Sequence, residues 1–152
     1  MATADFSNYL DVPVEDIEAP LPPPDGHYFA TIKAWTQREV DFKQGDGPQA
    51  VISLLFTLTS PDTDVDETAL PKGGVAGKLV SRDYSLSDGS GQSMLRTLGE
   101  DTLDLPVKGH SLRDLLNMLP SQEVKVFIQQ RAGKGANEGK FYADVKKVLA
   151  PH

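Results

Sequence analysis

The run RAGKGANEGK, residues 131–140, has the glycine and lysine content of a phosphate-binding loop. Such a loop requires the pattern G-x-x-x-x-G-K-[ST], followed by a helix whose N-terminus faces the phosphate. Counting back from Gly139, the first glycine of the pattern is replaced by Lys134, and Phe141 stands where the hydroxyl is required. The residues that follow alternate like a strand. The sequence therefore excludes a nucleotide loop of this type and predicts a basic hairpin loop.

A second run, PDTDVDET, places Asp62, Asp64 and Asp66 at alternate positions, as at the start of a calcium-binding loop. The sixth position of such a loop is glycine and the twelfth is glutamate. Here those positions hold Glu67 and Gly73. We therefore expect a solvated acidic loop and no metal site.

Catalytic chemistry finds little support in the sequence. His27, His110 and His152 stand far apart, and no pair of them has the spacing of metal ligands. The chain has no cysteine, which removes thiolate chemistry and a disulfide framework. We predict a protein that is not an enzyme and needs no cofactor, with a nuclease accessory domain as a weaker alternative.

Aromatic and cationic side chains recur together in strand-like segments. In EVKVFIQQR, the side chains of Lys125, Phe127 and Arg131 share the face opposite the branched apolar residues. Single-stranded nucleic acid stacks its bases on aromatic rings, at ~1–3 kcal/mol each, while cations follow the phosphates. The residues predicted to contact DNA are Trp35, Arg38, Phe42, Lys43, Arg82, Tyr84, Lys125, Phe127, Arg131, Lys134, Lys140 and Tyr142. Taken singly, Tyr84 and Phe127 also fit core positions, and the lysines also fit a solvated face.

The elements that position these residues follow from periodicity. A chain of 152 residues fits one domain. A period of two predicts strands over 27–35, 50–60, 77–87, 123–131 and 140–149, and helical spacing predicts helices over 90–100 and 111–119. In the first strand, Tyr28 and Ile32 fall on one face and Trp35 on the other. Ser111 and Asp114 form a capping-box pattern at the start of the second helix.

The resulting order, β-β-β-α-β-β, is that of the OB-fold, a five-stranded and partly open barrel. We therefore predict a mainly β protein with an OB-fold domain over residues 26–152. Other small barrels and α+β sheets share the same alternation. In an OB-fold, strands two and three and the loops between strands 1–2 and 4–5 form the binding surface.

Charge is distributed unevenly along the chain. The whole chain carries −7, of which −6 lies in residues 1–26, leaving −1 for the rest. Residues 1–25 are also rich in proline, so we predict an extended acidic arm there. No apolar run approaches the ~18 residues of a membrane span. With no export signal and no cysteine, the sequence is typical of a cytoplasmic protein.

Three segments carry a resemblance to a known family: PPPDGHYFATIKA, GKLVSRDYSLS and VFIQQRAGKGANEGKFYADVKKVLAP. They resemble the P-x-G-x-Y-x-x-x-I opening, the G-[KR] strand start and the closing strand pair with an N-E loop element of small phage-encoded OB-fold proteins. The resemblance covers about residues 22–151. It implies a protein that binds single-stranded DNA during phage DNA replication or recombination, in the cytoplasm of the infected bacterium.

One feature departs from that pattern. Many single-stranded DNA-binding proteins recruit partners through an acidic C-terminal tail, whereas this chain ends in VKKVLAPH and has its acidic arm at the front. We therefore expect any contact with replication or recombination proteins to be made by the arm. The alternative function is a phage protein-interaction module on the same barrel. Outward-facing Trp35, Phe127 and Tyr142 favour DNA binding, and inward-packed rings favour the interaction module.

Overall fold

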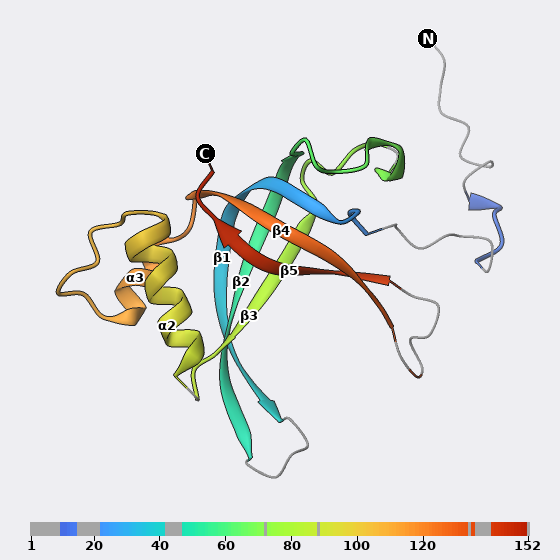
Figure 1. Cartoon of the computed structure of the whole chain (residues 1–152). Helices are drawn as coiled ribbons and strands as arrows, with labels where there is room; N and C mark the ends of the chain where they lie inside the picture. Colours follow the sequence, from blue (N-terminus) through green and yellow to red (C-terminus); the bar gives the residue numbers. More distant parts are fainter. Residues whose placement is uncertain are drawn as a thin grey trace.

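One five-stranded antiparallel sheet forms the body of the molecule (Figure 1). The computed structural model describes residues 10–14, 22–41, 47–71, 73–87, 89–133, 135 and 141–151. Its strands are β1 (Gly26–Asp41), β2 (Pro48–Pro61), β3 (Leu79–Ser85), β4 (Glu123–Ala132) and β5 (Phe141–Leu149). They lie in the order β3-β2-β1-β4-β5. The predictions of a mainly β fold and of five strands are confirmed.

The helical segments lie between β3 and β4, as predicted. They are α2 (Ser90–Thr97), the π-helical turn η3 (Leu98–Thr102) and α3 (Leu112–Met118), and a 3-10 turn, η2 (Glu67–Ala69), precedes β3. The capping box is confirmed: the Asp114 N–H donates to Ser111 Oγ at 3.2 Å, and the Ser111 N–H donates to the Asp114 carboxylate at 3.4 Å. Among the described helices, none has the length and apolar character needed to cross a membrane.

The sheet curls but does not close. Strands β3 and β5 form its two edges, and some of their Cα atoms approach within 8 Å. In the part of the chain that the structure describes, no backbone ladder joins these two strands. The predicted OB-fold barrel is therefore not confirmed: the strands form an open sheet with a seam between β3 and β5. Closure would need two facing strand edges in register, which side-chain periodicity does not determine.

Side chains from the inner face of the sheet and from the helices form one core. Tyr28, Leu54, Phe56, Leu58 and Val126 are all fully buried in it, as alternation predicts.

The predicted face of Trp35 is wrong. Lys33 is an extra residue in β1, since Ile32 pairs with Phe56 and Ala34 with the next residue of β2, Leu55, and it changes the phase of the strand. Trp35 consequently pairs with the buried Leu54 and packs against the core. Its indole N–H donates to Asn117 Oδ1 on α3 at 3.1 Å. An extra residue in a strand turns all later side chains to the opposite face, because the period is two.

Most of the predicted acidic arm lies outside the described residues. Its last residues, 22–25, run beside β4. There the backbone N–H of Gln130 donates to the Asp25 carboxylate at 2.7 Å, and the Gln130 side-chain amide donates to the Pro23 carbonyl at 3.0 Å. Strand β1 then begins at Gly26.

The buried Tyr28 predicts a loss of stability at alkaline pH. Its hydroxyl donates to the Pro24 carbonyl at 2.6 Å, and burial raises its pKa to about 12, with a further contribution from Asp25 and Asp64. The folded protein therefore keeps this proton at a pH where the unfolded chain, with a tyrosine pKa near 10, has lost it. We expect this group to reduce the free energy of unfolding by roughly 1.4 kcal/mol per pH unit between about pH 10 and 12.

Denaturant unfolding at several pH values between 8 and 12 measures this effect. The Tyr28→Phe variant should show a shallower dependence, because it lacks the proton that unfolding releases. Parallel pH profiles for the two proteins would contradict the assignment.

Candidate nucleic-acid interface

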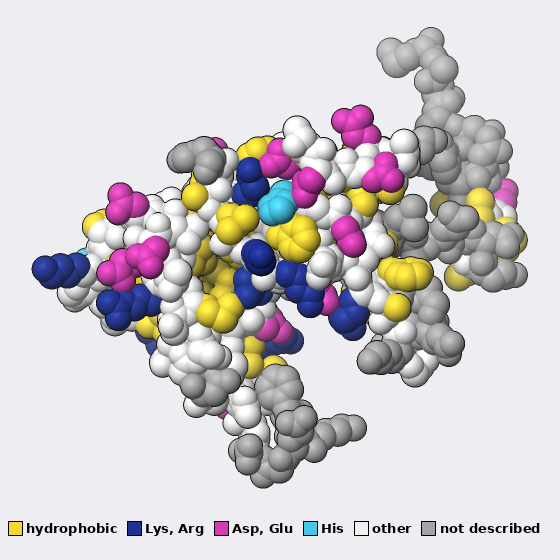
Figure 2. Space-filling model, viewed as in Figure 1, with side chains coloured by type: hydrophobic (Ala, Val, Ile, Leu, Met, Phe, Trp, Pro, Cys, Tyr) yellow, Lys and Arg dark blue, Asp and Glu magenta, His cyan; other side chains and the backbone are white. Residues whose placement is uncertain are grey.

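Three aromatic residues and three cations gather on the outer face of β1, β4 and β5. We call this set the outer patch; it consists of Phe29, Lys125, Phe127, Arg131, Tyr142 and Lys147. Alternation along β4 produces it, because Val124 and Val126 are buried in the core, so that Lys125 and Phe127 face away from it. Figure 2 shows hydrophobic and cationic side chains side by side over β4 and β5.

The sheet register places each ring of the outer patch directly opposite a cation. Phe29 pairs with Lys125 across β1 and β4. Phe127 pairs with Lys147, and Tyr142 pairs with Arg131, across β4 and β5. Directly opposite residues have Cβ atoms about 4.5–5.5 Å apart. The three cross-strand pairs therefore form a row of alternating aromatic and positive groups.

Side-chain contacts hold this row in place. The Lys125 ammonium lies 5.0 Å from the centre of the Phe29 ring, and the Arg131 guanidinium lies 5.0 Å from the centre of the Tyr142 ring. The Phe127 ring is tilted by 46° against the His27 ring, with the two centres 4.8 Å apart. All three aromatic side chains of the patch remain partly exposed.

Carboxylates partner two of the three cations. Lys125 Nζ lies 2.8 Å from an Asp62 oxygen, and Arg131 Nε lies 2.9 Å from an Asp144 oxygen. The hydrogen bond from Lys125 also holds the pKa of Asp62 below its ordinary value. Within the described residues, Lys147 has no ion-pair partner. A phosphate arriving at the patch would meet one free cation and two that must exchange a carboxylate for it.

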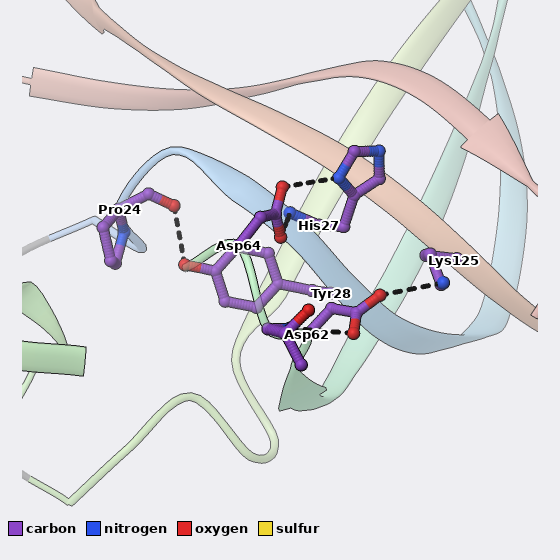
Figure 3. Close-up of polar contacts among 7 residues, drawn as sticks. Pro24, His27, Tyr28, Asp62, Asp64 and Lys125 are labelled. Carbon is purple, nitrogen blue, oxygen red and sulfur yellow. Dashed lines mark hydrogen bonds and ion pairs between the residues drawn. The ribbon is translucent and has the colours of Figure 1, made fainter. Parts of the chain in front are cut away.

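The acidic run after β2 packs against the start of β1, where Asp64 contacts His27 (Figure 3). The Asp64 carboxylate accepts from the backbone N–H of His27 at 3.0 Å and lies 2.7 Å from His27 Nδ1. The Asp66 carboxylate caps η2 by accepting from the Thr68 N–H, while Asp62 holds Lys125. The three carboxylates thus serve three separate partners. No group of His, Asp and Glu side chains in the described chain converges in a way that could hold a metal ion.

The surface of β2 and β3, where the OB-fold prediction places the binding face, has a different character. The aromatic side chains of these two strands, Phe56 and Tyr84, are both buried. Arg38 forms an ion pair with Asp83, which also accepts a hydrogen bond from Ser53. The outer side of these strands is polar, and the neighbouring Arg38 of β1 is neutralised by Asp83, so this side offers little for bases or phosphates to contact.

The predicted contact residues therefore divide into separate groups. Lys125, Phe127, Arg131 and Tyr142 come together in the outer patch. Trp35, Arg82 and Tyr84 lie on the inner side of the sheet, and Tyr84 is buried. Arg38 lies apart from the outer patch, paired with Asp83. Phe42, Lys43, Lys134 and Lys140 lie outside the described residues.

Sequence reasoning missed Phe29 and Lys147. Alternation alone places Phe29 on the face opposite Tyr28, but its importance depends on the strand that lies beside it. The missing signal was the cross-strand register, which brings Lys125 and Phe29 together from nearly a hundred residues apart.

Comparison with known protein families and curated proteins identifies no relative of this chain. No family model matches the sequence, and the search of curated proteins found no match. Function is therefore argued from the outer patch itself.

Proposed function

We propose that the protein binds single-stranded DNA on the outer patch, without catalysis. The three cross-strand pairs of an aromatic ring and a cation carry this proposal. Rings stack with bases of any kind, and neighbouring cations bind the phosphates between them. A row of such pairs matches the alternation of bases and phosphates along a single strand, whereas a duplex keeps its bases stacked inside.

Binding would proceed by exchange of partners. Phosphates displace Asp62 from Lys125 and Asp144 from Arg131, and Lys147 is available directly. The bases then cover Phe29, Phe127 and Tyr142, which are already oriented by contacts with their neighbours. Little sequence preference is expected, because stacking tolerates every base.

The proposal includes a fold: the sheet is an OB-fold barrel that is open between β3 and β5. A five-stranded OB barrel has strand three beside strand five, and the order β3-β2-β1-β4-β5 leaves these two strands as adjacent, unpaired edges. Together with the family resemblance, this supports a role in phage DNA replication or recombination in the host cytoplasm. The acidic arm is then the part that contacts replication or recombination proteins.

A second candidate is a protein-interaction module. The inward packing of Trp35 favours it, because that ring is removed from any surface that could stack on bases. The ion pairs of Lys125 and Arg131 with carboxylates also favour the interaction module, since they reduce the positive charge of the patch.

Salt dependence tests the first candidate. With three phosphates neutralised, the logarithm of the association constant for labelled oligo-dT should fall with the logarithm of salt concentration with a slope of about −2, at ~0.7 per contact. The triple variant Lys125→Gln, Arg131→Gln and Lys147→Gln should bring this slope close to zero and weaken binding at low salt.

A matched triple variant removes the same charge elsewhere. Lys33, Lys108 and Arg113 are exposed and lie outside the outer patch. Their replacement by glutamine should leave the slope almost unchanged. Equal binding of a duplex of the same length, or no binding of oligo-dT at low salt, would reject the proposed function and leave the interaction module.

A further inference from the structure

Two hollows lie along the seam between β3 and β5. The larger, of about 570 Å³, is lined by Arg82, Asp83, Arg131, Tyr142, Asp144 and Lys146. The smaller, of about 300 Å³, is lined by Tyr84, Met94, Leu98 and Leu149 together with the cations Arg82, Lys146 and Lys147. Arg82 and Lys146 line both hollows. Small-molecule sites typically begin at ~300 Å³.

Arg82 is an unusual side chain for its position. It lies between Val80 and Tyr84 on the inner side of β3 and is partly buried, with its guanidinium 5.2 Å from the centre of the Tyr84 ring. The carboxylate next to it in sequence, Asp83, points outward to Arg38. No other described carboxylate forms an ion pair with Arg82. A partly buried charge without a counter-charge is costly, and an anion bound in the seam would offset that cost.

The β5 side of the seam adds to the positive charge. Lys146 is the extra residue at the register shift of β5, where Phe127 pairs with Lys147 and Ile128 with Val145. The shift turns Lys146 toward the seam, where it lines both hollows. Its ammonium lies 3.9 Å from the Asp144 carboxylate, which is engaged more closely by Arg131 at 2.9 Å.

The smaller hollow is mainly apolar beyond these cations. Its walls come from the ring of the buried Tyr84, from α2 and η3, and from the end of β5. Met94 and Leu149 remain 40% and 38% exposed there, which leaves apolar surface open to a ligand. Methionine adapts well to flat, polarisable rings. The hollow therefore suits an aromatic heterocycle with an anionic group attached on the Arg82 side.

We propose that the seam is a nucleotide subsite: Arg82 and Lys146 bind a phosphate, and the base lies in the apolar hollow beside Met94. The subsite adjoins the outer patch along the free edge of β5: Arg131 and Tyr142 also line its larger hollow, and Lys147 also lines the smaller one. Its ligand is a nucleotide unit, either a free mononucleotide or one nucleotide of a strand that crosses this edge. If the ligand is one nucleotide of a bound strand, the inference rests on the proposed function. If it is a free mononucleotide, it does not.

Titration of the full chain with dTMP, followed by NMR chemical shifts, tests the subsite. Shifts should concentrate at β3, α2 and the end of β5. The Arg82→Gln variant should bind dTMP about 10- to 100-fold more weakly, which corresponds to the loss of a charge-assisted hydrogen bond. Met94→Glu, at an exposed position, should weaken binding as well, because it places a carboxylate in the base hollow. Arg96→Gln, on the same helix but paired with Glu100, is the matched control and should bind like wild type.

Several outcomes decide the proposal. Displacement of dTMP by unphosphorylated oligo-dT shows that the subsite takes a nucleotide of a strand; simultaneous binding of both shows that it takes a free nucleotide. If inorganic phosphate binds as tightly as dTMP, and the Met94→Glu variant binds dTMP like wild type, then the base contact is wrong and the subsite with it. Absence of dTMP shifts in the seam, with oligo-dT still bound by the outer patch, would overturn the subsite while leaving the proposed function intact.

Discussion

Replacing both Phe127 and Tyr142 with alanine should weaken the binding of single-stranded DNA at least about 30-fold. Each ring supplies ~1–3 kcal/mol of stacking, so the pair supplies roughly 2 kcal/mol at the lower limit. Both rings lie on the outer face of β4 and β5, opposite Lys147 and Arg131. Because the cations remain, the salt dependence of the residual binding should stay near that of wild type. Fluorescence anisotropy with labelled oligo-dT at several salt concentrations measures both quantities.

Phe141 provides a matched control for this variant. It precedes Tyr142 in β5, is 58% exposed and points to the opposite face of the strand. The Phe141→Ala variant removes a similar ring from the same hairpin and should leave the affinity within about twofold of wild type. Equal losses for the two variants, or no loss for the double variant, would show that the rings of the outer patch do not stack on bases.

Gly91→Ala should be among the most destabilising single substitutions in this protein. Replacing glycine by alanine within a helix ordinarily stabilises by about 1 kcal/mol. At Gly91 in α2, however, an added Cβ would lie 2.7 Å from both the backbone N and the backbone C of Ser85, and closer still to its carbonyl oxygen. Neither backbone can move without separating α2 from the end of β3. We expect the free energy of unfolding to fall by about 2 kcal/mol or more, and Tm by roughly 5 °C.

Ser93→Ala, two residues further along α2 at an exposed position, is the control. It should leave stability unchanged or slightly raised, because alanine favours helix and no atom of the sheet lies in its way. Thermal unfolding followed by circular dichroism compares the two variants. A Gly91→Ala protein as stable as the Ser93→Ala protein would mean that α2 does not pack against Ser85 as closely as described.

The features that the sequence determined by itself are those set by neighbours along the chain. Alternation located all five strands, and helical spacing located α2 and α3, since burial repeats with the period of each element. The capping box at Ser111 and Asp114 was predictable for the same reason: both hydrogen bonds join residues only three apart. Lys125 and Phe127 were placed correctly on one face because no register shift separates them.

The tertiary structure decided the features that depend on which strands become neighbours. The extra residue Lys33 in β1 turned Trp35 from the predicted surface into the core, and the extra residue in β5 turned Lys146 toward the seam. Pairing of β1 with β4 brought Phe29 to Lys125.

The roles of the acidic loop and of Arg82 were decided in the same way. Asp62 and Asp64 partner Lys125 and His27 only after the loop folds back over the start of β1. Arg82 lacks a carboxylate among the described residues because its neighbour Asp83 points to the other side of the strand. The register of the strands and the folding of the acidic loop over β1 are long-range properties. They follow from the free energy of the whole sheet and core, and no local pattern of residue types encodes them.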